Sequence, residues 1–531
     1  MSQPFPPEMK RSTHPNFVIL GIPIGDKAFC STFISEKYEE AKALLHKLEE
    51  VSAVDPHVAF SLLRQCAGFC KLAHLARGTQ LSQAISALEA FDHNIRATFS
   101  KCTVVGTSNQ AWQQAELSLS RGGLGIRSLS RHSPAAYIAS LSSSGAVPLS
   151  QEHLIHAVEL FNSLVPSSEA VSMEEVLTSR IHYKVLSNKI DNHLFNILYE
   201  QSSAADRARL LSISSPHAAS WVSVIPSEGL GLHLQPSEFQ VAIKWWLGLD
   251  TSCGSICPLC PGRILDPLGH HALTCKRGGD VVTRHNKLRD TLAETCRRAH
   301  LSVKVKAGSN LTKDHSHTRP ADILVPNWSM GKLAAFDLSV TSPLNSNVLL
   351  EAAGQAARAT EQRKHDENDA KCKELGWICV PMVVEAYGAW GTEAMESFSL
   401  LASRLATSSN RAKAEVLAAL IWQAEPQLTP DGFDAVSVQN VGSTYIIVSW
   451  DLPTHSNGIL INFSPPVTPT GTALQLERGV GRHQCCSQPA QHEEDSPPGG
   501  PPDPESDTND IVISLFINKI INLTSPLAPP L

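Results

Sequence analysis

Charged residues are scarce in this chain of 531 residues, making up 18% of it, against about 25% in an average soluble protein. Hydrophobic residues supply 42%, slightly below the usual ~45–50%. That fraction still allows sizeable cores, so a wholly disordered or collagen-like chain is excluded. The length suggests roughly three or four domains.

Long apolar runs are also missing. The N-terminal stretch MSQPFPPEMKRSTHPN has no apolar segment of the signal-peptide type. The longest late apolar run, from Ile511 to Ile521, is about half a membrane span and contains Lys519. The 13 cysteines are scattered and odd in number, which suits a reducing compartment. We therefore expect an intracellular protein that is neither secreted nor membrane-bound.

Helical periodicity dominates the first half of the chain. Apolar residues recur at helical spacing in 34–51, and Asp55 followed by Pro56 is typical of a helix start. The segment 17–25, FVILGIPIG, predicts a short buried strand and turn, and the Gly-rich 122–125 predicts a structural turn rather than a phosphate loop. The periodicity predicts further helices at 57–77, 81–98, 134–142 and 411–427, mainly helical structure over 152–250, and mixed helix and strand over 284–400.

A cysteine–histidine cluster follows the helical half. Cys257 and Cys260 form a C-x2-C pair, and His270 and Cys275 follow as H-x4-C. Two thiolates on a tight turn, with a His and a Cys from a helix start, complete a tetrahedral zinc site with four protein ligands. His271 is the alternative fourth ligand, and Cys253 is a less favoured spare. The competing interpretation is unpaired cysteines beside an ordinary loop.

The segment after this cluster is basic. Residues 276–319 contain eleven Lys and Arg against four Asp and Glu, although the whole chain has a net charge of −7. The acidic segment 493–531, with seven acids and Lys519, accounts for most of that charge. A basic block suits phosphate binding, or else forms a solvated helix face. The candidate nucleic-acid contacts are Arg284, Lys287, Arg289, Arg297, Arg298 and Arg319.

Two aspartates come next, each followed by alternating apolar residues. Asp322 and Asp337 are separated by fourteen residues, so two antiparallel strands could bring their carboxylates to one end of a sheet. Converging carboxylates can hold Mg²⁺, which activates water against a phosphodiester. Lys364 is the candidate for charge stabilisation, and Glu294 and Glu351 are accessory acids. The alternative is that both aspartates merely cap strand ends.

Several of these segments together resemble the C-terminal part of non-LTR retrotransposon reverse transcriptases that carry a restriction-enzyme-like endonuclease. The resemblance covers residues 15–425. It is carried by LGIPIG at 20–25, AWQQAELSLSRGGLGIRSL at 111–129, CPLC with GHHALTC at 257–275, RPADILV with FDLSVTSP at 319–343, and EQRKHDENDAKCKELGWICVPMVVEAYGAWG at 361–391.

The resemblance implies a thumb-like helical region at 1–150, a helical connector at 151–250 and a zinc knuckle at 251–280. It also implies an endonuclease domain of the PD-(D/E)XK superfamily at 281–428, whose acids would be Asp322 and Asp337. The chain contains no Asp-Asp pair, so reverse-transcriptase activity is not implied. Ser339 stands where the superfamily often has Lys, and Lys364 from the next helix is the substitute.

The C-terminal part has a different character. Residues 433–464 resemble the first half of a fibronectin type III domain, with Trp450, Pro453 and an Asn457-Gly458 turn. A complete sandwich needs about seven strands, so 429–464 predicts only a partial β-sandwich. The Pro-rich and acidic segment 465–531 is expected to be disordered.

These observations predict an α+β multidomain protein with a helical region, a zinc knuckle and a mixed α/β nuclease-like domain. The leading hypothesis is a truncated, retrotransposon-derived DNA endonuclease that uses structural Zn²⁺ and catalytic Mg²⁺, located in the nucleus if functional. The alternatives are a non-catalytic relic that binds DNA or RNA, and an interaction protein acting through the fibronectin-like segment. No small-molecule cofactor is expected, and the sequence does not indicate an oligomeric state.

Overall fold

A computed structural model describes residues 16–79, 81–144, 151–228, 232–251, parts of 256–277, 280–305, 321–344, 354–409 and 412–424, with three short strands between 446 and 477. The chain divides into two compact units. The larger comprises 1–224, 234–401 and 417–433, and the smaller comprises 225–233, 402–416 and 434–531. The fold is mixed α/β and mainly helical.

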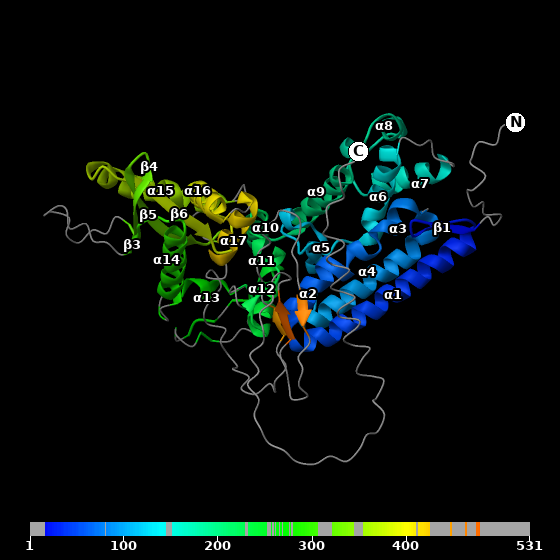
Figure 1. Cartoon of the computed structure of the whole chain (residues 1–531), viewed down its shortest axis with the longest axis horizontal. Coiled ribbons are helices and arrows are strands. Elements are labelled where there is room, and N and C mark those ends of the chain that lie inside the picture. The colour runs from blue at the N-terminus through cyan, green and yellow to red at the C-terminus, as the bar shows by residue number, and fades with distance from the viewer. Residues whose placement is uncertain are drawn as a thin grey trace, which may run out of the picture. The chain divides into compact units, whose positions relative to one another are not determined.

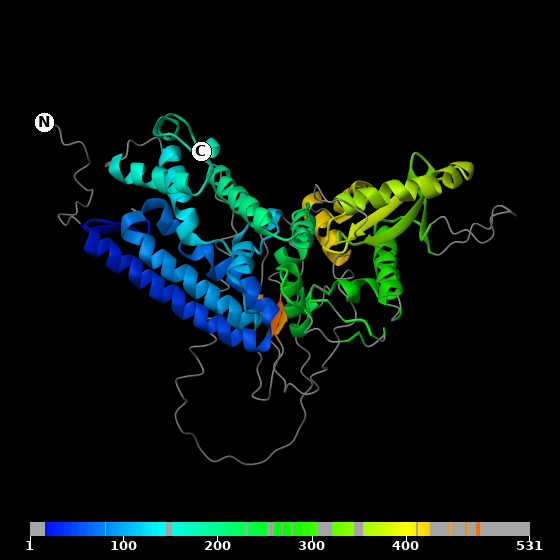
Figure 2. The ribbon, with the colours of Figure 1, turned by 180° about the vertical axis from the view of Figure 1, so that it is seen from behind.

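A hairpin and a pair of long helices begin the larger unit. Strands β1 (Phe17–Ile19) and β2 (Ile22–Ile24) pair antiparallel. Helix α1 (Lys27–Val54) starts where the Asp26 side chain accepts the Phe29 N–H at 2.8 Å. It runs beside α4 (Leu81–Thr103) in both Figure 1 and Figure 2. The expected helices over 34–51 and 81–98 are confirmed. The expected buried strand over 17–25 forms a hairpin of two strands, and most of its residues are half-buried or exposed.

The segment 57–77 was expected to form one helix, and it is broken instead. Asp55 caps α2 (Pro56–Leu62) as predicted, by accepting the Val58 N–H at 2.9 Å. A π-helical turn (η1, Leu63–Ala67), a 3₁₀ turn (η2, Phe69–Lys71) and the short α3 (Ala73–Gly78) follow. The break lies at Gly68, where an added Cβ would lie 2.8 Å from the Leu63 carbonyl oxygen, so the chain bends where only glycine fits.

The glycine-rich segment forms a turn, as predicted. It follows α5 (Asn109–Glu116) and the 3₁₀ turn η3 (Leu119–Arg121). Gly122 and Gly125 have φ of +70° and +71°. A Cβ on Gly123 would lie 2.0 Å from the Leu117 carbonyl oxygen, so backbone packing requires these glycines.

The other helices of this region are α6 (Leu129–Ser144), α7 (Gln151–Ser163), η4 (Ser167–Glu169), α8 (Met173–Thr178), α9 (Tyr183–Gln201), α10 (Ala204–Ile213), α11 (Ser220–Ser223) and α12 (Pro236–Trp246). Together with α1, α2 and α4 they bury one large apolar cluster that includes Phe60, Phe99 and Trp246, and a second cluster includes Phe161 and Ile190. This confirms the expected helical content of 134–142 and 152–250. In the part of the chain that the structure describes, no helix has the length and apolarity to cross a bilayer.

A mixed sheet carries the rest of the larger unit. Its order is β3 (Lys304–Val305), β4 (Ile323–Ser329), β5 (Lys332–Thr341) and β6 (Ile378–Glu385). β3, β4 and β5 pair antiparallel, whereas β5 and β6 pair parallel. The surrounding helices are α13 (His270–Thr274), α14 (Asp280–Arg298), α15 (Gln355–Glu374), α16 (Thr392–Ser409) and α17 (Lys413–Ala424).

Helix α15 forms the crossover between the two parallel strands and packs along β5 and β6 (Figure 1). Its inner side meets a small apolar cluster that includes Leu324, Ala335 and Cys372. The mixed α/β character predicted for 284–400 is therefore present. The two antiparallel strands predicted beside Asp322 and Asp337 are also present, as β4 and β5.

Three short strands are described beyond residue 430, namely β7 (Ile446–Val448), β8 (Asn462–Ser464) and β9 (Leu474–Glu477). β9 pairs parallel to β7 and antiparallel to β8. β9 lies in the segment 465–531, which was expected to be disordered, and it completes a sheet with the two earlier strands. Trp450, Pro453 and Asn457-Gly458 lie outside the described residues.

Candidate metal centre and carboxylate site

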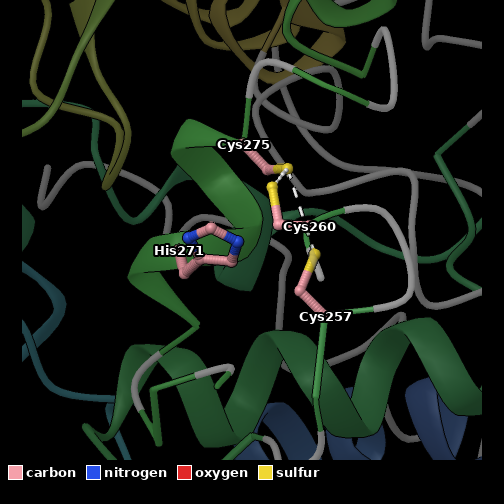
Figure 3. A group of neighbouring side chains, drawn as sticks. All are labelled: Cys257, Cys260, His271 and Cys275. Atoms are coloured by element: carbon pink, nitrogen blue, oxygen red, sulfur yellow. Dashed lines mark hydrogen bonds between the residues drawn. The ribbon is translucent and has the colours of Figure 1, made fainter. Parts of the chain in front are cut away.

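Cys257, Cys260, His271 and Cys275 lie close together, with ligand atoms all within 4.8 Å of one another. The Cys275 Sγ lies 3.4 Å from the Cys260 Sγ and 4.0 Å from the Cys257 Sγ. Figure 3 shows the three sulfurs facing one another and a ring nitrogen of His271 directed toward them. We call these four residues the cysteine–histidine cluster. It is a group that could hold a metal ion.

The histidine of this cluster is His271, which the sequence offered as the alternative ligand. His270, the first choice from the H-x4-C spacing, is not part of the cluster. Both residues lie in the first turn of α13, where their backbone N–H groups donate to Asp266 at 2.9 and 2.5 Å. Successive side chains of a helix diverge by about 100°, so only one ring can face the thiols. The ring Nε2 of His270 instead lies 3.1 Å from the Ser342 hydroxyl oxygen.

The donor set fits a thiophilic divalent ion. Cys257 and Cys275 are each 4% exposed, so their thiols are shielded from water. Among the described residues, the buried His271 Nε2 has no hydrogen-bond partner. An unsatisfied buried ring nitrogen is costly, and a metal bond would satisfy it. Cys253 lies outside the described residues.

The second group of functional side chains lies on the sheet. Ile323 on β4 pairs with Phe336 on β5, so Asp322, directly before Ile323, lies at the end of the ladder next to Asp337. The Asp322 N–H donates to the Phe336 carbonyl at 2.9 Å, which fixes this end of the ladder. The Asp322 carboxylate also accepts the Leu338 N–H at 2.9 Å, so Asp322 contacts the residues on both sides of Asp337. The fold therefore places the two aspartates side by side.

Asp337 is held by two side chains of α15. Lys364 Nζ donates to one carboxylate oxygen at 2.9 Å, and Asn368 Nδ2 donates to the other at 2.9 Å. Lys364 and Asn368 are four residues apart and so share one helix face. Lys364, the predicted candidate for charge stabilisation, therefore contacts one of the two predicted acids, and Asn368 contacts the same carboxylate.

Asp322 is held differently, by the basic helix and by the sheet. Nε2 of His285 on α14 lies 3.0 Å from one carboxylate oxygen of Asp322, and the Leu338 N–H donates to the other at 2.9 Å. The side chains of His285 and Asp322 are 30% and 25% exposed, and those of Lys364 and Asp337 are 17% and 13% exposed. The five side chains Asp322, Asp337, His285, Lys364 and Asn368 form what we call the carboxylate site.

The pKa values of the two aspartates move apart. Burial acts to raise the pKa of Asp322, but the hydrogen bond and charge of His285 outweigh it, so this pKa lies below its ordinary value. Burial raises the pKa of Asp337, and the charge of Asp322 raises it further, although Lys364 opposes both. Two acids in contact with opposite shifts are typical of functional carboxylate pairs.

The accessory acids do not join this site. Glu294 lies on the exposed side of α14, where its carboxylate pairs with Arg297 at 3.1 Å. The prediction that Glu294 is an accessory acid of this site is therefore wrong, because its position on the helix directs its side chain to solvent. Glu351 lies outside the described residues.

Two of the predicted nucleic-acid contacts are internal. Arg284 and Arg289 are 7% and 6% exposed. Arg284, Leu288 and Leu292 are spaced four apart, so Arg284 shares the buried face of α14 with two core leucines. This geometry corrects the assignment of Arg284 and Arg289 to phosphate binding. Lys287, Arg297 and Arg298 are exposed, and Arg319 lies outside the described residues.

Two residues of the carboxylate site, His285 and Asn368, were not predicted from the sequence. Asn368 could have been predicted from its spacing, since it lies one helical turn after Lys364 on the same face. His285 could not, because its contact with Asp322 spans 37 positions and depends on how α14 packs on the sheet. No family model matches this chain, and no curated protein matches it either.

Proposed function

We propose that this protein is a metal-dependent DNA endonuclease with a structural zinc site, similar to the endonuclease part of non-LTR retrotransposon proteins. The observation that carries the proposal is the neighbouring pair Asp322 and Asp337, whose charges interact, with Lys364 on one oxygen of Asp337. Hard carboxylate oxygens that repel one another are a natural site for Mg²⁺. The charge of Asp322 raises the pKa of Asp337, and a bound cation would relieve this repulsion.

Each residue of the carboxylate site has a role in this proposal. Asp322 and Asp337 would hold Mg²⁺, which when bound lowers the pKa of water and stabilises charge on the phosphodiester. His285 and Asn368 orient the two carboxylates through hydrogen bonds of 3.0 and 2.9 Å. Lys364 keeps a positive charge beside Asp337, where it can stabilise the negative charge that develops on the phosphate.

The cysteine–histidine cluster has a structural role in this proposal. Three thiolates and one imidazole form a closed set of four ligands, which suits Zn²⁺ and leaves no position for catalysis. The cluster joins the turns around Cys257 and Cys260 to α13, directly before the basic helix α14. We expect zinc removal by a strong chelator, or Cys275→Ser, to increase hydrogen exchange in 256–275. Unchanged exchange after zinc removal would contradict the structural role.

Plasmid nicking tests the nuclease. The full chain with Mg²⁺ or Mn²⁺ should convert supercoiled DNA into the open circular form. Asp337→Asn keeps the shape of the side chain but removes its charge, and it should lower the nicking rate about 100-fold or more. Asp366→Asn is the matched control, because Asp366 is an exposed residue of the same helix and its carboxylate accepts a hydrogen bond from Gln362 at 3.0 Å. Intact plasmid with the wild-type chain, or equal nicking by Asp337→Asn, would refute the proposal.

A second candidate is a protein that binds nucleic acid without cutting it, and the exposed Lys287, Arg297 and Arg298 on α14 favour it. Because cations on phosphates release counterions, binding should weaken steeply with salt. Charge reversal, Arg297→Glu with Arg298→Glu, should weaken binding and reduce the salt slope. Salt-sensitive binding without nicking would select this candidate, and binding that ignores ionic strength would exclude both.

A further inference from the structure

A second group of potential metal ligands lies between α15 and β6. A nitrogen of His365, a carboxylate oxygen of Asp369 and the Sγ of Cys379 all lie within 4.8 Å of one another. None of the three belongs to the cysteine–histidine cluster or to the carboxylate site. They combine nitrogen, oxygen and sulfur donors, whereas the carboxylate pair offers oxygen alone.

The histidine is oriented from both sides. His365 and Asp369 lie one turn apart on α15, and the Nδ1 of His365 is 2.8 Å from the Asp369 carboxylate. The Nε2 of the same ring hydrogen-bonds the carboxylate of Glu393 at the start of α16. The backbone N–H of Glu393 donates to Glu361 at 3.1 Å, which fixes that end of α16. A carboxylate on one ring nitrogen and a metal on the other is a recurrent arrangement in metal sites.

The thiol completes the group from the neighbouring strand. Cys379 pairs with Ala335 in the β5–β6 ladder and is 7% exposed. Cys372, one turn after Asp369 on α15, hydrogen-bonds Cys379. A pocket of about 300 Å³ is lined by Asp369, Cys372 and Cys379, together with Lys332, Lys373, Gly376 and Trp377. The group is therefore open on the side of Asp369 and closed on the side of the sheet.

We propose that His365, Asp369 and Cys379 bind a zinc-class divalent ion, with the fourth position directed into this pocket. Nitrogen and thiolate donors favour Zn²⁺ or Co²⁺ over Mg²⁺ and Ca²⁺, which require oxygen ligands. The ion takes the place of the proton between the His365 Nδ1 and Asp369, and this proton and that of the Cys379 thiol pass to solvent. The bound ion joins α15 to β6. Two of its ligands, His365 and Asp369, are the direct neighbours on α15 of Lys364 and Asn368, which contact Asp337.

Ion pairing is the competing account, in which His365 only bridges Asp369 and Glu393. That account does not involve Cys379, because a thiol adds nothing to a carboxylate–imidazole–carboxylate bridge. Zinc content therefore separates the two. The full chain is loaded with Zn²⁺, dialysed with a non-thiol reductant, and analysed for bound metal.

The wild-type chain should hold one ion in each of the two groups. Asp369→Asn should lose about half of the bound zinc, and it should fold normally because the Asp369 side chain is 58% exposed. Cys379→Ser should have the same effect. Matched controls are Asp366→Asn on the same helix and Cys296→Ser, a buried cysteine of α14 that is 0% exposed. Both controls should keep all the zinc.

Cobalt locates the second ion. In the double variant Cys257→Ser with Cys275→Ser, bound Co²⁺ should still give a thiolate charge-transfer band. The triple variant that adds Cys379→Ser should lack this band. Zinc content that falls with Cys275→Ser but not with Asp369→Asn or Cys379→Ser would overturn this site and leave the first one standing. Nicking activity is not part of the readout, so failure of the nuclease proposal would be seen separately.

Discussion

Two polar groups in this protein use similar residues to different ends. In the helical region, the Ser187 hydroxyl lies 3.0 Å from the His132 Nδ1, and the His132 Nε2 lies 3.5 Å from Asp191. Arg127 closes the group with a bond of 2.6 Å to Asp191. We call these four residues the helical polar group. The carboxylate site likewise joins aspartate to histidine and to a cation.

The helical polar group links serine, histidine and aspartate in the same order as a hydrolytic Ser-His-Asp triad, but it is buried away from solvent. Ser187 is 0% exposed, and His132 and Asp191 are each 1% exposed, so no substrate can reach the serine. Its charges also balance, because one carboxylate meets one guanidinium while burial lowers the pKa of His132 and favours the neutral ring. The group therefore joins α6 to α9 and has no unmet charge.

The carboxylate site is partly open to water. Two carboxylates face one ammonium and one histidine, and all are between 13% and 30% exposed. The comparison teaches that residue types alone do not separate a structural group from a functional one. Exposure does so, because only a site that water reaches can take up a cation from it.

The largest expected effect is on the helical polar group. Asp191→Ala leaves the Arg127 guanidinium without its charge partner, and removing one member of a buried ion pair typically costs about 3–5 kcal/mol. We expect that loss in the free energy of unfolding measured with urea. Asp366→Ala, at an exposed position of α15, should cost less than about 0.5 kcal/mol. Similar losses in both variants would remove the structural side of the comparison.

Magnesium should stabilise the carboxylate site and leave the helical polar group unchanged. Mg²⁺ at about 100 times its dissociation constant would add about 2.7 kcal/mol to the free energy of unfolding. The gain should appear as a higher melting temperature in the wild-type chain and disappear in Asp337→Asn. A gain that survives in Asp337→Asn would show that the ion binds elsewhere.

The pH dependence of stability provides the next contrast. Burial lowers the pKa of His132 below its ordinary value of 6.5, although the hydrogen bond to Asp191 opposes this. The unfolded chain therefore binds a proton first, so the stabilising contribution is complete above about pH 6.5 and is lost as the pH falls below it. The slope reaches about 1.4 kcal/mol per pH unit for one such group. His132→Gln should flatten unfolding free energies measured between pH 5 and 7, and an unchanged slope would contradict this assignment.

Local patterns in the sequence predicted the elements but not their long-range contacts. The Asp55 cap, the glycine turn at 122–125 and the strand bearing Asp337 follow from neighbouring residues and were predicted correctly. The break at Gly68 was missed because it depends on backbone packing that periodicity does not show.

The candidate sites show the same division. The spacing of the cysteines and the pairing of Asp322 with Asp337 could be predicted, because a short loop and a hairpin fix them locally. The choice of His271 over His270 depends on the rotation of α13, and His285 reaches Asp322 only through the packing of α14. Arg284 and Arg289 counted as charges in the sequence, although the fold buries both.

The smallest expected effect lies one residue from the carboxylate site. Arg363 pairs with Glu367 at 2.6 Å on the outer face of α15, and the two side chains are 55% and 48% exposed. Exposed pairs of this spacing contribute about 0.3–0.5 kcal/mol, so Arg363→Ala should change the free energy of unfolding by no more than that and leave nicking unchanged. Lys364→Ala, at the adjacent position, should abolish nicking, because the Lys364 side chain is only 17% exposed and its ammonium contacts Asp337. Equal effects of the two variants on nicking would show that general charge on α15 matters, and not the geometry at Asp337.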